Sequence, residues 1–283
     1  MIYPIQQSII WLLLALGVLG NLGILMILKF EKSLRTFTKM MFTLQVVADL
    51  MWITWQVIFI AYVSLQPSPI PFILTLINIM LAASIICSLW CVAVVALEQM
   101  CLVVWPTNPI IRRAAFKESA IVYSSLVLFS LVLSAIGQFL LNFDAVWKIV
   151  LGYILDHFLP LFVSFLCLAV FLHKIKTSSR RVNCDEENQL TRPSLLPIQI
   201  VGVASTFTFI VHIPMMCLTI KQFHDKFENP LQGRAEVNIW KWFQLVWFSN
   251  FTLKVFFYTI IIPHFRKSFV DICKKAKNKF IRN

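Results

Sequence analysis

The sequence predicts an all-α membrane protein, a bundle of seven transmembrane helices with its N-terminus outside the cell. Its 283 residues are 59% hydrophobic and only 13% charged, whereas soluble proteins average about 25% charged residues. Seven runs of roughly 20 mostly apolar residues recur along the chain, and each is long enough to cross a bilayer. Lysine and arginine concentrate in alternate loops between these runs. A soluble core of this size could not bury so much apolar surface.

The predicted spans, in order, cover residues 8–28, 40–62, 72–104, 119–141, 149–172, 195–220 and 237–262. The third is the longest, so a helix along all of it has to tilt or protrude. The fourth is interrupted only by Gly137. Alternating ten-residue segments, which are typical of β-barrels, are absent. The spans are therefore predicted to be helices.

The charge distribution predicts the orientation of the bundle. Nineteen of the 25 lysines and arginines fall in the loops after the first, third and fifth spans or in the C-terminal tail. Four fall in the opposite loops, and two lie within the last span. Because positive loops stay cytoplasmic, the N-terminus is placed outside and the C-terminus inside. The same loops account for the net charge of +12 without a nucleic-acid site.

The segment 263–283 is predicted to be a cytoplasmic amphipathic helix. Its apolar residues recur at helical spacing with lysine and arginine between them, starting at Phe265. Such a helix lies on the anionic inner leaflet of the bilayer. Cys273 on its apolar face is a candidate for palmitoylation, and an unmodified cysteine is the alternative.

Asp49 is the one acid of the long apolar second span, and Lys254 is a base within the seventh span. A single acid at that depth costs roughly 2.5–3.5 kcal/mol, so Asp49 is expected to face the protein interior and to have a partner. Lys254 is the candidate partner. The alternative is that Lys254 snorkels to the inner interface, about 11 Å away.

The sequence carries no motif of an intramembrane enzyme. It has no His-Glu-x-x-His, no paired intramembrane aspartates, no Gly-x-Ser-x-Gly and no CxxC-type metal-binding pair among its 7 cysteines. We therefore expect no enzymatic activity, no cofactor and no metal site.

Short motifs with regular spacing extend along the whole chain. They are Gly20-Asn21 and Ala48-Asp49 in the first two spans, Ser88 and then Glu98-Gln99-Met100 with Pro106 after it in the third, Pro160 and Pro214 in the fifth and sixth, and Tyr258 followed by Phe265-Arg266. Together they resemble the motifs of rhodopsin-like (class A) G-protein-coupled receptors. The resemblance implies a multi-pass plasma-membrane receptor whose partners are a small-molecule ligand and a heterotrimeric G protein.

Several letters of these motifs differ from the family pattern. Gln99 stands where the family has an arginine that engages the G protein, and Lys254-Val255 replaces its Asn-Pro pair. His212 replaces a tryptophan two residues before Pro214. The cysteine pair that joins the third span to the second outer loop is missing. Such erosion is similar to that of nematode chemosensory receptors.

The resemblance also implies roles for residues at two depths. Asn21, Asp49, Ser88 and Asn250 match positions that surround a sodium ion in the family, and we expect the Lys254 ammonium to replace that ion. The predicted G-protein face comprises Glu98, Gln99, Met100 and Tyr258. Glu98 lacks the adjacent arginine of the family's inactive-state lock, so this lock is either absent or made with Arg112, Arg113 or another loop base. Pro160 and Pro214 each remove a backbone hydrogen bond and are expected to kink their helices.

Polar residues in the outer halves of the spans are the candidate ligand contacts, namely Asp156, His157, His212, Asn78 and Lys241. A structural hydrogen bond is the alternative for His212, and interfacial snorkelling is the alternative for Lys241. Aromatic residues near the outer ends favour a small, mostly apolar ligand with one polar handle, or else form an interfacial belt. They are Trp52, Trp55, Phe59, Trp240, Trp242 and Trp247.

Two other functions compete with that of a signalling receptor. One is a non-signalling receptor partner or chaperone, which the missing arginine at Gln99 would suit. The other is a small-molecule transporter or channel, which would need inverted repeats or a line of ionisable groups across the membrane. No such repeat is present, and the two buried charges of the second and seventh spans lie at one depth.

Overall fold

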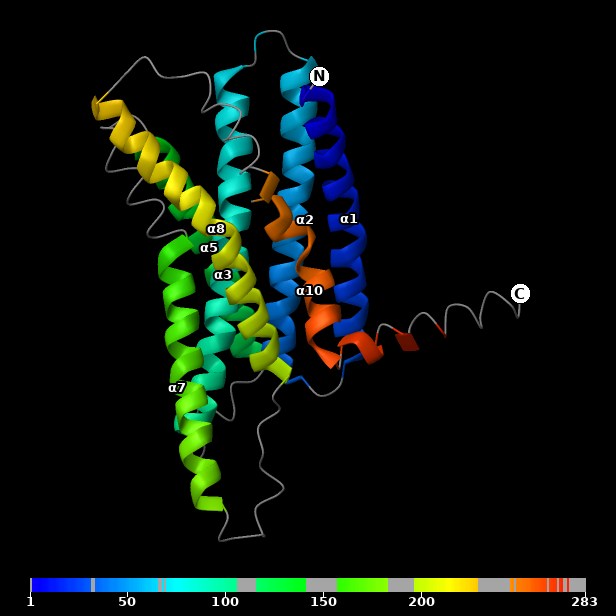
Figure 1. Cartoon of the computed structure of the whole chain (residues 1–283), viewed down its shortest axis with the longest axis vertical. Coiled ribbons are helices and arrows are strands. Elements are labelled where there is room, and N and C mark those ends of the chain that lie inside the picture. The colour runs from blue at the N-terminus through cyan, green and yellow to red at the C-terminus, as the bar shows by residue number, and fades with distance from the viewer. Residues whose placement is uncertain are drawn as a thin grey trace.

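The computed structural model is all-helical over the residues that it describes, which are 2–31, 34–65, 68, 70–105, 116–140, 157–182, 196–228, 245–246, 248–263, 265–268, 270–271 and 274. No residue in these ranges belongs to a β-strand. The main helices are α1 (Ile2–Phe30), α2 (Thr36–Leu65), α3 (Pro71–Val104), α5 (Phe116–Leu140), α7 (Leu159–Val182), α8 (Leu196–Glu228) and α10 (Lys254–Ile261) (Figure 1). The predicted all-α class is confirmed for this part of the chain.

Four of these helices are long and apolar enough to cross a membrane, as predicted for the first four spans. The spanning stretches are Gln7–Phe30, Thr36–Leu65, Pro71–Val104 and Ala120–Gln138. The fifth and sixth predicted spans contain shorter apolar helices, Leu159–Lys174 and Leu196–His212. These helices support a membrane protein, because a helix is one of the few structures that satisfies its backbone hydrogen bonds within lipid.

The sequence marks both ends of α3. Pro71 occupies the first turn, where its missing N–H removes no helical hydrogen bond. Ile70 is extended (φ −70°, ψ 122°), as expected for a residue before proline, and its N–H donates to the Tyr62 hydroxyl at 2.8 Å. The helix ends at Val104, and Trp105 leaves the helical conformation just before Pro106.

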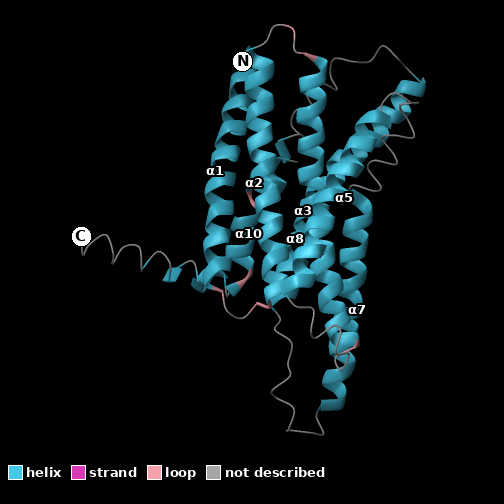
Figure 2. Ribbon diagram, turned by 180° about the vertical axis from the view of Figure 1, so that it is seen from behind, coloured by secondary structure: helices cyan, strands magenta, loops and turns pink. Residues whose placement is uncertain are grey.

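Helix α3 is the centre of the bundle. Two thirds (67%) of its most apolar stretch is buried inside the protein, compared with 22%, 28% and 17% in the stretches on α1, α2 and α5. Seen from behind, α1, α2 and α3 run side by side, and α8 runs obliquely to them (Figure 2). The outer helices therefore expose their apolar faces to the surroundings, as helices facing lipid do.

The segment before α10 approaches α1 very closely at Gly17. A Cβ atom on Gly17 would lie 2.7 Å from Thr252 Cγ2 and 2.8 Å from Ile53 Cδ1. Only glycine fits there without a shift of these side chains. The close contact brings the segment 248–252 against α1 and α2.

The seventh predicted span is not one continuous helix. The described parts of 245–252 are helical, Leu253 is a bend, and α10 begins at Lys254. Beyond α10, the predicted amphipathic tail is helical at 265–268, 270–271 and 274. The number of spans and the N-terminus-outside topology stay predictions.

Candidate functional site

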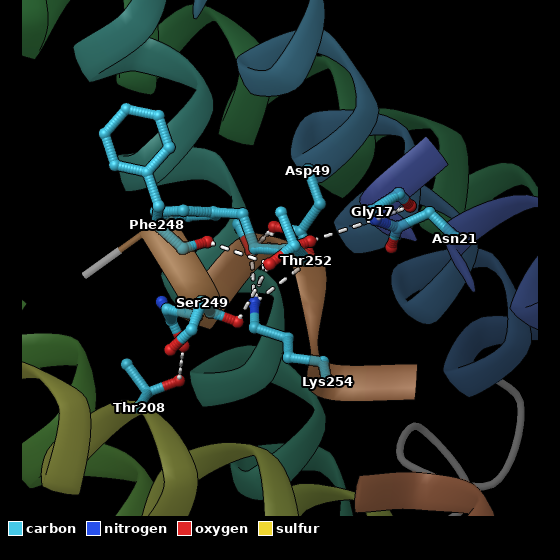
Figure 3. A network of polar contacts seen from close by, with 11 residues as sticks. Gly17, Asn21, Asp49, Thr208, Phe248, Ser249, Thr252 and Lys254 are labelled. Carbon is cyan, nitrogen blue, oxygen red and sulfur yellow. Dashed lines mark hydrogen bonds and ion pairs between the residues drawn. The ribbon is translucent and has the colours of Figure 1, made fainter. Parts of the chain in front are cut away.

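A buried polar site joins Asp49 of α2 and Lys254 at the start of α10 (Figure 3), together with Ser88 of α3. Lys254 Nζ lies 3.1 Å from Asp49 Oδ2 and 3.3 Å from Oδ1. It also donates to Ser88 Oγ at 3.2 Å, and the Ser88 hydroxyl donates to Asp49 Oδ1 at 2.7 Å. The three residues are at most 3% exposed. We refer to them as the ion-pair core.

The ion pair expected from the sequence is therefore present, and Lys254 does not snorkel to the inner interface. The arrangement follows from the cost of burying charge, because each ion would be strongly destabilised without the other. The Phe251 ring, whose centroid is 5.4 Å from Lys254 Nζ, adds a cation–π contact.

The helix is broken at Leu253, directly before the Lys254 of the ion-pair core. Leu253 has φ −101° and ψ −3°. Its carbonyl accepts from the N–H groups of Phe256 at 3.0 Å and Phe257 at 3.3 Å. The Phe251 carbonyl accepts instead from Asn21 Nδ2 at 3.0 Å. The helical segment is thus interrupted directly before Lys254-Val255, although no proline is present there.

The two asparagines of the predicted polar core hold the broken segment from opposite sides. Asn21 Nδ2 donates to the carbonyls of Phe251 and, at 2.9 Å, of Gly17. Asn250 Oδ1 accepts from the Thr208 hydroxyl of α8 at 2.9 Å. Both asparagines are buried. Of the five residues predicted for this core, Ser88 bonds directly to Asp49 and Lys254. Asn21 and Asn250 link the segment before Lys254 to α1 and α8.

Thr208 is a site residue that the sequence analysis missed. A sequence signal for it exists, because Ser205, Thr208 and His212 recur at spacings of three and four in the apolar run of α8. That spacing places them on one helical face. All three are nearly fully buried.

A second polar cluster lies at the C-terminal end of α3. Glu98 Oε1 is 3.0 Å from Arg35 Nη1, and Glu98 Oε2 accepts from the Thr38 hydroxyl at 2.6 Å. Gln99 Nε2 donates to Glu98 Oε2 at 3.2 Å and to Thr38 Oγ1 at 3.3 Å. The base that Glu98 contacts therefore comes from the loop after α1. The cluster ties the start of α2 to the end of α3.

The other residues of the predicted G-protein face are partly or fully enclosed. Gln99 and Tyr258 are buried. The Tyr258 ring packs against that of Phe265, with centroids 5.8 Å apart. Met100 is half-buried and packs against the hydrophobic core of the helices. Their predicted contact with a G protein stays a prediction.

Two of the five predicted ligand contacts meet in a pocket between α7 and α8. The ring centroids of His157 and His212 are 4.9 Å apart. The Nδ1 atom of His212 donates to the Thr208 carbonyl at 2.7 Å, which is the structural hydrogen bond considered for it. A cavity of about 100 Å³ is lined by His157, Phe158, Leu161, Phe162 and Phe165 of the α7 segment and by Phe209 and His212 of α8.

The remaining predicted residues are not at this pocket or lie outside the described part of the chain. Asn78 is half-buried on α3 and is not a lining residue. Asp156, Lys241, Cys273, Arg112 and Arg113 fall outside the described residues.

The two prolines expected to kink their helices lie within α7 and α8. Pro160 is buried, and its carbonyl accepts from the Ser164 hydroxyl at 2.8 Å. Helix α8 continues through Pro214, whose side chain is not described.

Trp52 lies in the core between α2 and the segment 248–252. It is 0% exposed. Its ring stacks on Phe251 with centroids 4.3 Å apart and meets Phe248 edge-on at 5.0 Å. Trp52 thus packs α2 against the segment that carries Asn250 and leads into Lys254.

Within the described residues, no three His, Cys, Asp or Glu side chains lie close enough to hold a metal ion. The chain matches no protein-family model, and no curated protein sequence matches it significantly.

Proposed function

We propose that this chain is a divergent rhodopsin-like receptor of the plasma membrane, with seven helices and its N-terminus outside. It binds a small, largely apolar extracellular ligand in the outer half of the bundle and signals by opening its cytoplasmic face to a heterotrimeric G protein. The motifs along the sequence support this proposal, and so do the apolar helices. The proposal includes the chemosensory role that the eroded motifs suggest.

The observation that carries the proposal is the ion-pair core and its connection to the pocket between α7 and α8. His212 lines the pocket and bonds to the Thr208 carbonyl. The Thr208 hydroxyl bonds to Asn250, which lies one helical turn before Lys254. A ligand that moves α8 at His212 therefore acts on the backbone that positions the ion pair. A buried polar network with two alternative packings is a suitable switch element.

The cluster at the C-terminal end of α3 supplies the second part of the mechanism. Glu98 connects α3 to Arg35 and Thr38 and holds the inner ends of α2 and α3 together. Opening of the cytoplasmic face would weaken these contacts. The Arg35 side chain is 34% exposed, so this ion pair is expected to be modest and reversible.

Gln99 is the observation that favours the second candidate, a non-signalling receptor partner. It stands at the family's arginine position and is only 4% exposed, with its amide bonded to Glu98 and Thr38. A neutral, inward-facing side chain does not supply the cation that the family presents to its G protein. The transporter alternative gains no comparable support.

A nucleotide-exchange assay separates these functions. The full chain in lipid nanodiscs is mixed with heterotrimeric G proteins of each major class, and GTP exchange is measured with a panel of small apolar compounds. The receptor proposal predicts faster exchange with at least one pair of compound and G protein. A Gln99→Arg variant is measured alongside. If neither form accelerates exchange, and co-expression with another receptor raises that receptor's surface level, the partner function replaces the proposal.

A further inference from the structure

The pocket between α7 and α8 results from a mismatch in how the two helices meet. Two ring pairs bridge them, His157 with His212 at 4.9 Å and Phe165 with Phe209 at 5.6 Å between centroids. The two bridges are eight residues apart along α7 but three residues apart along α8. At 1.5 Å per residue these separations are roughly 12 Å and 4.5 Å. Close packing cannot continue from one bridge to the other, and α8 indeed runs obliquely past α7 (Figure 1).

The walls of this pocket are almost entirely carbon. Five of the seven lining residues, four phenylalanines and Leu161, have no polar side-chain atom. Of the two histidines, His212 already uses Nδ1 to bond the Thr208 carbonyl. A charged or strongly hydrogen-bonding molecule would lose its hydration here with little return.

The pocket opens on the outer surface of the helix pair. Its rim residues Phe158, Phe162 and Phe209 are 45%, 54% and 39% exposed. The floor residues Leu161 and His212 are 7% and 1% exposed. If α7 and α8 span the bilayer as proposed, this exposed phenylalanine surface faces lipid chains. A molecule dissolved in the membrane then reaches the pocket sideways.

We propose that this pocket binds a small, uncharged aromatic molecule without a hydrogen-bonding group, which enters from the bilayer between α7 and α8. A closed apolar cavity of about 150 Å³ is known to hold benzene. The cavity here is smaller, about 100 Å³, but its mouth is open, so one ring can enter it with one edge left in the mouth. Exposed ring edges and faces on the walls suit aromatic contacts with such a ring.

This inference deepens the proposed receptor function, and its role as a signal rests on that function, but binding can be measured without any signalling. An occupant lies against Phe209 and His212, which follow Thr208 by one and four residues on the same helix, and the Thr208 hydroxyl bonds to Asn250. An occupant of the pocket can therefore change how α8 holds the segment 248–252 before Lys254. It also revises the sequence expectation of a ligand with one polar handle.

The test is photolabelling of the full chain in lipid nanodiscs with phenyl trifluoromethyl diazirine, followed by mass spectrometry. The probe should label Leu161, Phe165 and Phe209 in a saturable manner. Toluene at about ten times its Kd should reduce this labelling about tenfold. Ile121, which is 67% exposed on α5, reports contact with probe dissolved in lipid and should not be protected.

Two variants and one competitor make the test specific. Leu161→Trp fills the pocket and should abolish the saturable labelling. The matched control is Gly202→Ala, whose added methyl meets only Leu168 Cδ2 at 3.8 Å; it should leave the labelling unchanged. Should Leu161→Trp fail to fold, Phe209→Ala widens the pocket and should let naphthalene compete. Either variant behaving as wild type overturns the proposal.

Each remaining outcome decides one of the two proposals. If toluene does not protect the pocket residues, or if benzyl alcohol protects them better than toluene, the inferred ligand class is wrong. Saturable labelling without any G-protein response would leave the pocket in place and count against the receptor function. A G-protein response without saturable labelling would support the receptor function and overturn the proposed pocket ligand.

Discussion

Removing one charge of the ion-pair core should destabilise the protein far more than removing both. Lys254→Met keeps the length of the side chain but leaves Asp49 buried with the Ser88 hydroxyl as its hydrogen-bond donor. Loss of one partner from a buried ion pair costs about 3–5 kcal/mol. Asp49→Asn should cost less, because its amide oxygen can still accept from Lys254. The double variant Asp49→Asn/Lys254→Met should lie within about 1 kcal/mol of wild type, because well-shaped neutral replacements of a buried pair are often tolerated.

Reversible unfolding in mixed detergent micelles measures these free energies of unfolding. Lys176→Met removes an exposed lysine of α7 and is the matched control, with an expected change within about 0.5 kcal/mol. The double-mutant cycle then gives the coupling energy of the pair. A cost below about 1 kcal/mol for Lys254→Met, or a double variant that costs the sum of the two single ones, would refute the reasoning.

Three further predictions follow from the same contacts. Lys254→Asn restores a neutral residue beside Asp49, so sodium but not choline should raise the thermal stability of this variant on the order of 1 kcal/mol; a sodium effect in wild type would contradict the idea that the ammonium replaces the ion. Gly17→Ala should destabilise by about 1–3 kcal/mol in the same unfolding assay because of its two contacts below 3 Å, whereas Gly23→Ala, which meets nothing within 4 Å, should be neutral or stabilising. Glu98→Gln should weaken the hold on Arg35 by about 1 kcal/mol, so amides at the start of α2 should exchange hydrogen roughly fivefold faster; unchanged exchange there would show that the contact does not clamp the inner ends.

The helices and the ion pair were predictable because both follow from the cost of placing polar groups in an apolar medium. A backbone in lipid has to form its own hydrogen bonds, so apolar runs of sufficient length indicate helices. An isolated carboxylate at Asp49 needs a partner, and Lys254 is the base within the membrane that lies at its depth. These arguments depend on local composition and charge.

The contacts missed by the sequence analysis depend on packing between distant segments. Arg35 contacts Glu98 because the start of α2 packs against the end of α3. The sequence around Arg35 does not distinguish it from the other loop bases. The break at Leu253 could not be predicted, because no proline or glycine stands next to it in the sequence. Trp52 stands among membrane-interface aromatics in the sequence, but its packing on Phe251 places it in the core. The apolar character of the pocket depends on which faces of α7 and α8 meet, which periodicity does not determine.

The most direct test of the account is a solid-state NMR measurement of the dipolar coupling between Lys254 Nζ and the Asp49 carboxyl carbon in lipid bilayers. Lys254 Nζ is 3.1 Å and 3.3 Å from the two carboxylate oxygens, so the account predicts a clear coupling that disappears in Lys254→Met. Absence of that coupling in the folded wild-type protein, with the Lys254 ammonium exchanging freely with water, would contradict it.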